Sequence, residues 1–140
     1  MTDVNNEPSD VDLISRVLKE IKTVAVVGLS PKTDRPSHEV ASYLQSHGYT
    51  IVPVHPQADR ILGCQVYRRL EDIPYPVDCV DVFRRSEDTV EIAESAVRIG
   101  ARVLWLQLGV YNEVTKSIAE AGALTVIMDR CMKQEIEKRL

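Results

Sequence analysis

The sequence lacks the features of a membrane or secreted protein. No apolar run approaches the length that spans a bilayer, and the polar start "MTDVNNEPSD" has no secretory h-region. Cysteine is scarce, and the three residues present, Cys64, Cys79 and Cys131, form no close pair along the chain. This pattern favours free thiols in a reducing compartment. We therefore expect a cytoplasmic protein.

An excess of positive charge is also missing. The chain has 17 basic and 21 acidic residues and a net charge of −4, so it has no general attraction to nucleic acid or to an anionic membrane. Any anion site must therefore be a local cluster of cations. The length of 140 residues, with 44% apolar and 27% charged residues, suits one globular domain. We expect a flexible start over residues 1–8 and a single domain over residues 9–140.

Signatures of catalysis and of metal binding are absent from the sequence. No G-x-S-x-G, C-x-x-C or H-E-x-x-H pattern occurs, and the three histidines are scattered through the first half of the chain. Asp78, Asp81 and Asp129 lie within or at the end of predicted strands, which is weak evidence for acid–base chemistry. We assign no catalytic residue and no metal ligand.

What the sequence does contain is a regular alternation of apolar runs and amphipathic segments. Short apolar runs predict strands at 23–28, 49–54, 77–83, 102–109 and 124–129, with a short edge strand at 64–67. Helical spacing predicts helices at 10–21, 37–48, 86–100, 112–122 and after 131, with Ser9, Ser37 and Ser86 as N-caps. Such alternation predicts a Rossmann-like, doubly wound α/β domain, with a mainly parallel sheet of five or six strands and helices on both faces.

In a doubly wound sheet the ligand crevice lies beyond the carboxyl ends of the strands, where the strand order reverses. This rule selects five loops, at residues 28–37, 54–60, 82–86, 107–112 and 128–131. The content of these loops decides which ligand fits.

The first loop, "GLSPKTDRPS", has the chemistry of a phosphate site. Gly28 permits a sharp turn, Ser30 offers a hydroxyl, and Lys32 and Arg35 offer charge-assisted donors beside a helix start. The alternative is that Gly28 merely ends a strand and the cations are solvated. A nicotinamide or flavin dinucleotide is disfavoured, because Gly28 stands alone and no acidic residue ends the second strand.

The other loops add apolar and cationic groups. His55 and Pro56 form a rigid ledge that suits an adenine face, or else a Pro-stiffened surface turn. Phe83 with Arg84 suits base or pantetheine packing and phosphate neutralisation, unless Phe83 belongs to the core. Gln107 offers an amide. Asn112, later in the same loop, offers a second amide. In the fifth loop Cys131 is either a reactive thiol or a buried, inert one.

Five segments in order carry a resemblance to a known family: "VAVVGLSPKTDRPSHEVASYLQSHGY", "IVPVHP", "VDVFRR", "LWLQLGVYN" and "MDRCMK". They span residues 23 to about 133. In these segments the chain resembles the small stand-alone CoA-binding proteins, which are similar to the N-terminal CoA-binding domain of the succinyl-CoA synthetase α subunit. One position departs from that pattern, because His55 stands where similar proteins usually have Asn.

The resemblance implies that coenzyme A is held in the predicted crevice. It implies the following contacts: Gly28, Ser30 and Lys32 with the pyrophosphate; Arg35 with the same charge or the 3′-phosphate; His55 and Pro56 near the adenosine; Phe83 and Arg84 beside the pantetheine; and Gln107, Leu108 and Gly109 at a further CoA contact. The domains that give the synthetase its ligase activity have no counterpart in this sequence.

The leading hypothesis is therefore a non-catalytic module that binds, carries or senses CoA or an acyl-CoA. One alternative is an enzyme that acts on acyl-CoA or a CoA disulfide with Cys131 as its thiol. Another is a dinucleotide-binding regulator. No nucleic-acid or membrane partner is expected, and a homo-oligomer or a protein partner stays open.

Overall fold

The computed structural model describes residues 10–139, so the expected flexible start and the Ser9 cap lie outside the described residues. The helices are α1 (Asp10–Glu20), α2 (Pro36–Ser46), α3 (Thr89–Arg98), α4 (Glu113–Ala121) and α5 (Met132–Glu137). The strands are β1 (Thr23–Val27), β2 (Thr50–Val54), β3 (Arg60–Ile61), β4 (Cys64–Gln65), β5 (Cys79–Val82), β6 (Val103–Leu106) and β7 (Thr125–Ile127). Within residues 10–139, no helix has both the length and the apolar character that crossing a membrane requires.

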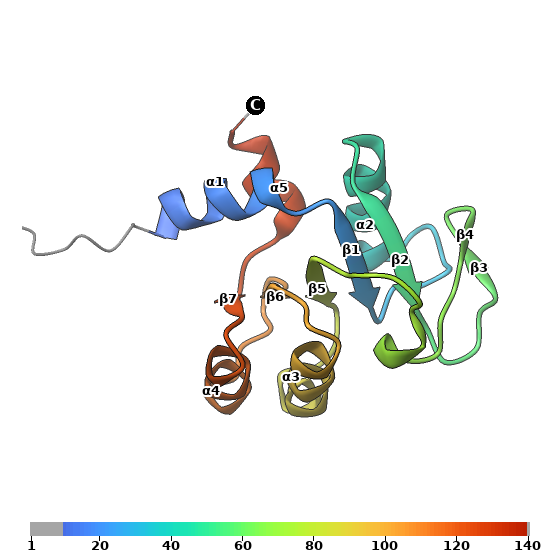
Figure 1. Cartoon of the computed structure of the whole chain (residues 1–140). Helices are drawn as coiled ribbons and strands as arrows, with labels where there is room; N and C mark the ends of the chain where they lie inside the picture. Colours follow the sequence, from blue (N-terminus) through green and yellow to red (C-terminus); the bar gives the residue numbers. More distant parts are fainter. Residues whose placement is uncertain (1–9, 140) are drawn as a thin grey trace, which may run out of the picture.

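Five of the strands form one parallel sheet in the order β2-β1-β5-β6-β7 (Figure 1). The chain first moves outward from β1 to β2, and then returns past β1 to build β5, β6 and β7 on the other side. The strand order therefore reverses between β1 and β5. This arrangement confirms the predicted Rossmann-like α/β fold and places the reversal, where such folds bind ligands, between two named strands.

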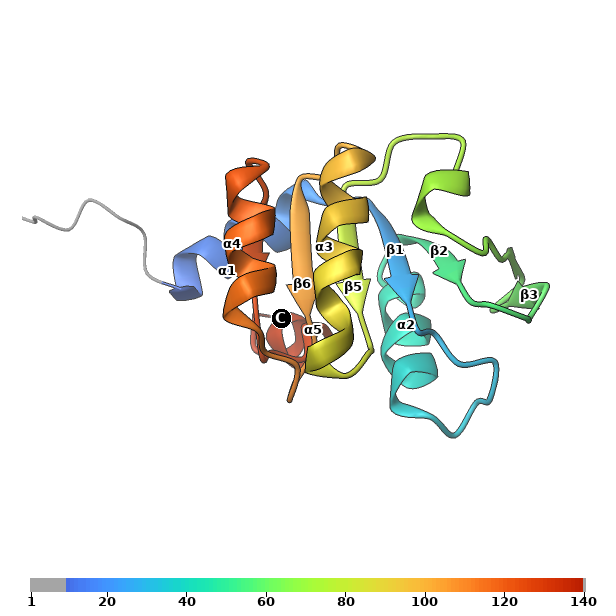
Figure 2. The ribbon, with the colours of Figure 1, turned by 90° about the horizontal axis from the view of Figure 1, so that it is seen from below.

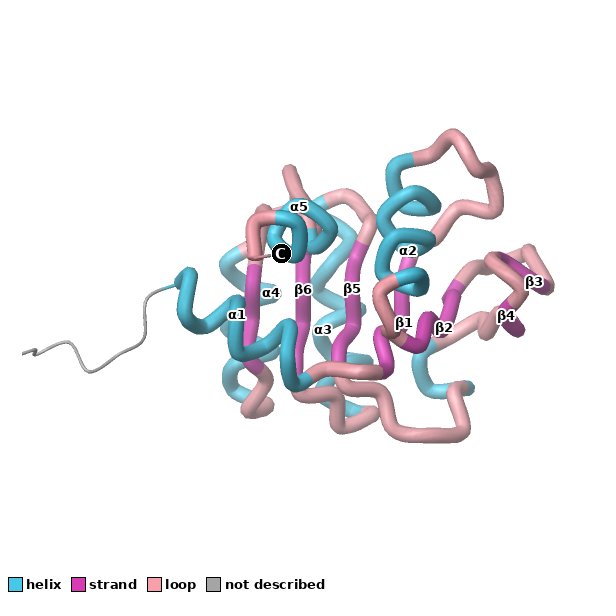
Figure 3. The backbone as a smooth tube through the Cα atoms, turned by 90° about the horizontal axis from the view of Figure 1, so that it is seen from above, coloured by secondary structure: helices cyan, strands magenta, loops and turns pink. Residues whose placement is uncertain are grey.

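The sheet separates two apolar cores. Helices α1, α2 and α5 cover one face and α3 and α4 cover the other, as the views from the two sides show (Figures 2 and 3). Alternate strand residues feed the two cores, so Val26 packs toward α2 while Ala25 packs toward α3. Burial on both faces explains why each strand is an apolar run rather than an alternating one. Trp105 of β6 is fully buried.

The edge of the sheet beyond β2 differs from the prediction. The expected edge strand at 64–67 is divided: β4 pairs with β3 in a small antiparallel hairpin, while Tyr67 forms an isolated parallel bridge with Val54. Pro53 does not interrupt β2, because Val54 still pairs with Val27. The carbonyl of Pro53 accepts a hydrogen bond from the N–H of Tyr67, on the outer side of β2. The missing N–H of Pro53 therefore faces away from β1 and does not disrupt the pairing of β2 with β1.

Two of the predicted N-caps are wrong. Helix α2 begins at Pro36 with Arg35 at the N-cap, and Ser37 Oγ instead accepts from the N–H of Ser30. Residues 86–88 form a short 3-10 turn before α3, and Ser86 Oγ accepts from the N–H of Tyr111. Both hydroxyls join loops at the carboxyl edge of the sheet. The sequence therefore predicts that these hydroxyls accept backbone hydrogen bonds, but not which N–H groups donate them.

Candidate functional site

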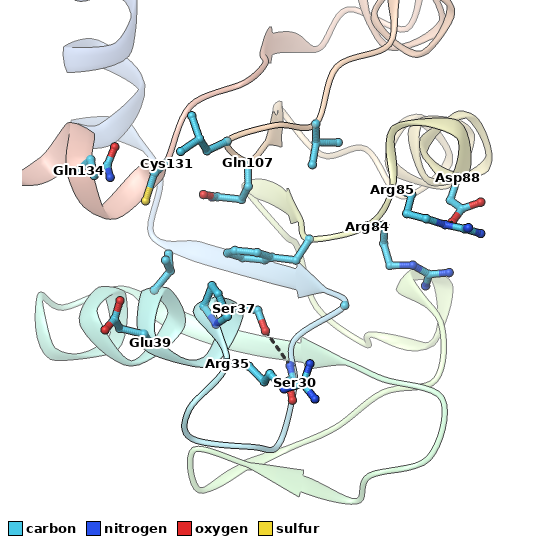
Figure 4. A pocket seen from close by; sticks show the side chains of 16 residues that line it. Ser30, Arg35, Ser37, Glu39, Arg84, Arg85, Asp88, Gln107, Cys131 and Gln134 are labelled. Atoms are coloured by element: carbon cyan, nitrogen blue, oxygen red, sulfur yellow. Dashed lines mark hydrogen bonds and ion pairs between the residues drawn. The ribbon is translucent and has the colours of Figure 1, made fainter.

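One cavity, called the main cavity below, lies where the strand order reverses. Its volume is about 860 Å³, and it opens beyond the carboxyl ends of β1, β5 and β6 (Figure 4). Seven of the eleven predicted site residues line it: Gly28, Ser30, Arg35, Phe83, Arg84, Gln107 and Leu108. Residues from α2 and from the start of α5 close the opposite wall, among them Val40 and Cys131. The cavity therefore lies at the sheet edge that strand topology alone predicts.

Gly28 fixes the close approach of β1 and β5 at the floor of the cavity. Its φ is +86°, which L side chains rarely adopt, and a Cβ placed there would lie 2.3 Å from the carbonyl oxygen of Phe83. The N–H of Phe83 in turn donates to the carbonyl of Val27 at 2.9 Å. The two strand ends are thus in direct backbone contact, and only glycine fits between them.

The loop after Gly28 is folded by its own hydroxyl groups. Ser37 Oγ accepts from the N–H of Ser30 at 3.0 Å (Figure 4). Ser30 Oγ in turn accepts from the N–H of Lys32 at 3.1 Å. Because both hydroxyls serve as acceptors here, their O–H groups can donate to a ligand oxygen. The backbone of Lys32 belongs to this turn, but its exposed side chain lies outside the cavity lining.

Two arginines give the cavity its positive charge. Arg35 precedes α2, and Arg84 follows β5; both are exposed, and within residues 10–139 neither enters an ion pair. Arg85 differs, because its guanidinium binds Asp88 at 3.1 Å and approaches Glu87 at 3.9 Å. Arg35 and Arg84 are therefore the cations best placed to receive an anion.

A second cavity adjoins the first and contains the predicted adenosine ledge. It has a volume of about 840 Å³ and is lined by His55, Pro56 and also Arg84, which thus borders both cavities. His55 Nδ1 accepts from the N–H groups of Gln57 and Ala58, at 3.0 and 2.9 Å. An Asn side chain makes the same kind of turn. His55 therefore takes the structural place of an Asn, and in the neutral ring the proton is on Nε2.

Gln107 lies on the cavity wall as the end of a buried hydrogen-bonded chain. Its Nε2 donates to Asp81 Oδ1, and its Oε1 accepts from the N–H of Met132 at 3.3 Å. Asp81 is fully buried, and burial raises its pKa to about 7, against the lowering effect of hydrogen bonds from Gln107 and Val82. The sequence places Asp81 in a predicted strand but gives no link to Gln107. The one feature of the sequence that could have indicated a special role for Asp81 is an acidic residue within an otherwise apolar strand.

The fourth loop reaches the cavity only in part. Leu108 lines it, although the side chain is 62% exposed. The N–H of Gly109 donates to Asp129 Oδ1 at 2.7 Å, and Gly109 lies outside the lining. Asn112, expected as an amide donor in the crevice, instead caps α4 through Oδ1 and donates from Nδ2 to the carbonyl of Ser86. That expectation is wrong, because the amide is occupied in holding two loops together.

The thiol of Cys131 is partly exposed on the α5 side of the cavity, next to Gln134 (Figure 4). Glu39 of α2 lies across from it and approaches Lys133 at 3.7 Å. No cluster of His, Cys, Asp or Glu within residues 10–139 could hold a metal ion. The arrangement thus offers hydroxyls and cations on one side, and an apolar wall with one thiol on the other.

Known proteins similar to this chain include members of a family of CoA-binding domains. The profile of a family described as "CoA binding domain" matches residues 22–137. The uncharacterized protein YneT of Bacillus subtilis is 42% identical over 120 residues, which cover 86% of this chain and 89% of that protein. The acetate–CoA ligase (ADP-forming) II of Archaeoglobus fulgidus is 39% identical over 83 residues, or 58% of this chain but 12% of the ligase.

The structure of a hypothetical protein from Pyrococcus horikoshii OT3 superposes with a TM-score of 0.89 at 33% identity, covering 99% of this chain and 96% of that one. The family match extends from the strand that delivers Gly28 to the helix that follows Cys131, so it includes every element that borders the cavity. The resemblance seen in the sequence is therefore confirmed, and the chain belongs to the CoA-binding domain family.

Proposed function

We propose that this protein binds coenzyme A, or an acyl-CoA, in the two adjoining cavities at the carboxyl edge of the sheet. One observation carries the proposal: at the reversal of strand order, Ser30, Arg35 and Arg84 border a cavity whose remaining wall includes Phe83 and Val110. Coenzyme A has the same division, with phosphates at one end and a long, weakly polar pantetheine at the other. Family membership supports this ligand over other phosphorylated molecules.

Each part of the ligand has a matching part of the site. Ser30 and Arg35, with the loop of Gly28, would hold the pyrophosphate, because hydroxyls and guanidinium groups are strong donors to phosphate oxygens. Arg84 borders both cavities and would neutralise a phosphate at their junction. The adenosine would then lie against His55 and Pro56. Lys32 and Gly109 lie outside the lining, and their proposed contacts require a ligand that reaches beyond it.

The pantetheine would run along Phe83 toward Gln107 and Leu108, which brings the CoA thiol to the wall formed by α5. The acids on the cavity lining are engaged elsewhere, since Asp88 binds Arg85 and Glu39 approaches Lys133. An acid–base pair directed at the thiol end is therefore not part of the proposed site. This favours a binding, carrier or regulatory role over catalysis.

A thermal-shift experiment tests the proposal. We expect CoA to raise the melting temperature while NAD and ATP leave it unchanged, because the site combines phosphate donors with a channel for pantetheine. The stabilisation by CoA should weaken steeply with ionic strength, since the arginines concerned are exposed. A melting temperature that CoA does not change would contradict the proposal, and a response to NAD would favour a dinucleotide-binding regulator.

A second candidate function has one observation in its favour. Cys131 lines the main cavity, on the wall where the CoA thiol would arrive. An enzyme acting on acyl-CoA or on a CoA disulfide would need a thiol there as its nucleophile. The two functions differ in the chemical reactivity of Cys131, which an alkylation experiment measures directly.

A further inference from the structure

A buried carboxyl group lies behind the wall of the main cavity, and the proposed binding of CoA gives it no direct contact. Asp81 of β5 is fully buried, and its Oδ2 has no hydrogen-bond partner within the described residues. In the sheet it is flanked by Val26 of β1 and Trp105 of β6, both apolar and both in the same core. A polar atom left unpaired at such depth is costly and therefore needs an explanation.

The other oxygen connects Asp81 to the cavity. Oδ1 accepts from Gln107 Nε2, and Gln107 Oε1 accepts from the N–H of Met132. The carboxyl thereby fixes the orientation of the amide, because a reversed amide would direct its NH₂ group at the N–H of Met132. Gln107 lines the cavity, and so does Cys131, the residue before Met132. Asp81 therefore holds two parts of the cavity wall in one arrangement.

The surroundings of Asp81 leave its charge sensitive to the contents of the cavity. Burial raises its pKa to about 7, against the lowering effect of the hydrogen bonds from Gln107 and Val82, and among the described residues no charged side chain contributes to this shift. The neighbouring ionisable group on its face of β5 is Cys79, whose pKa is raised well above the usual range by burial, then by Asp81 and Asp78. From α5, Met132 contributes only a backbone N–H to the chain. At neutral pH such a carboxyl is partly protonated.

We propose that Asp81 is a positioning residue for the cavity and that CoA binding draws a proton onto its carboxyl group. This inference rests on the proposed function, because bound CoA supplies both causes of the proton uptake. The ligand displaces water in front of Gln107 and brings negatively charged phosphates, and each effect disfavours the ionised carboxylate. The proton comes from solvent, and no bond of CoA is formed or broken. Because the complex holds more protons than the free protein, the affinity for CoA falls as pH rises through neutrality.

Calorimetric titration with CoA, in buffers of different ionisation enthalpy, measures this proton directly. Wild-type protein should take up a fraction of a proton per CoA near neutrality, and its affinity should fall about five- to tenfold between about pH 6 and about pH 8.5. Asp81→Asn keeps an acceptor oxygen for Gln107 but cannot titrate in this range. We expect the variant to bind with near wild-type affinity at the acidic end, with a smaller proton uptake and a shallower pH profile.

The comparison of wild type with Asp81→Asn separates proton uptake by Asp81 from proton uptake by other groups. The phosphates of CoA titrate equally in both proteins, and His55→Asn in both backgrounds removes the histidine of the second cavity. A purely structural role for Asp81 would lower the affinity of Asp81→Asn equally at every pH. Identical proton uptake and identical pH profiles in the two proteins would overturn the proposal.

A measurement on the wild-type protein covers the case in which Asp81→Asn does not fold. In a carbon-13 NMR titration of the Asp81 carboxyl, the midpoint should lie near pH 7 without CoA and move upward with CoA bound. A midpoint that CoA does not move would overturn the proposal while leaving CoA binding intact. If no CoA binds at any pH, titration heats are absent and the proposed function itself fails, which is a distinct result.

Discussion

Gly28 and Phe83 are in such close contact that a Cβ on Gly28 would lie 2.3 Å from the Phe83 carbonyl oxygen. These two residues directly follow β1 and β5, the strands between which the sheet reverses its order. The contact brings the loop with Ser30 and Arg35 next to the loop with Arg84. The floor of the candidate site is therefore built from backbone, and the cations stand on either side of it.

Gly28→Ala should damage both the fold and the site. The positive φ costs about 1–2 kcal/mol for an L side chain, and the collision with a backbone carbonyl brings the expected loss of stability to at least about 3 kcal/mol. Urea denaturation measures this loss. Gly100→Ala is the matched control, since Gly100 has a φ of +76° but no atom within 4 Å of its Cβ position. If the two variants lose equal stability, the close contact of the two strands is not the cause.

Arg84→Met should weaken CoA binding without unfolding the protein. The side chain is exposed and borders both cavities, so its loss removes charge-assisted hydrogen bonds to phosphate and little packing. We expect the Kd for CoA to rise about ten- to a hundredfold, measured by calorimetry. Affinity for pantetheine, which has no phosphate, should change little. Lys19→Met on the exposed end of α1 is the control, and an equal effect of both variants would contradict a specific phosphate contact.

Asp81→Asn should stabilise the protein at alkaline pH. The pKa of Asp81 is raised to about 7 in the folded protein, so between about pH 4 and about pH 7 the native state binds more protons than the unfolded chain. Its stability therefore falls as pH rises through this range, and the full penalty, on the order of 4 kcal/mol at most, is present above about pH 7. The free energy of unfolding of Asp81→Asn should exceed that of wild type at about pH 8 by more than at about pH 5. A constant difference would show that Asp81 does not titrate as stated.

Bound CoA should protect Cys131 from alkylation. The thiol is partly exposed on the cavity wall, so a small reagent can reach it in the free protein, and saturating CoA should slow the reaction by about tenfold or more. Mass spectrometry of the modified peptides measures the rate, with the partly exposed Cys64, outside the cavity lining, as an internal control. Equal protection of both thiols would indicate a general stabilisation instead. An unusually fast reaction of Cys131 alone would favour the catalytic alternative.

The sequence predicted the sheet and the location of the cavity because both follow from periodicity and from strand topology. It did not predict side-chain partners that join distant loops. Ser37 and Ser86 stand at the start of helical patterns in the sequence, so they have the signature of N-caps. Each instead accepts a backbone N–H from a loop at the same edge of the sheet. The position of Asn112 at a strand end predicts a crevice residue, but the side chain caps α4. The link from Asp81 to Gln107 joins residues 26 positions apart, and no local pattern encodes it.

An amide-resolved NMR titration with CoA tests the central claim most directly, because it reports both binding and its location. We predict that the amide signals of Gly28, Ser30, Phe83, Arg84 and Gln107 shift or broaden with one CoA per chain. The signals of Lys22, Asp78 and Arg102, which cluster through hydrogen bonds at the amino edge of the sheet, should stay in place. Unchanged spectra, or shifts confined to the amino edge, would contradict the assignment of the CoA site.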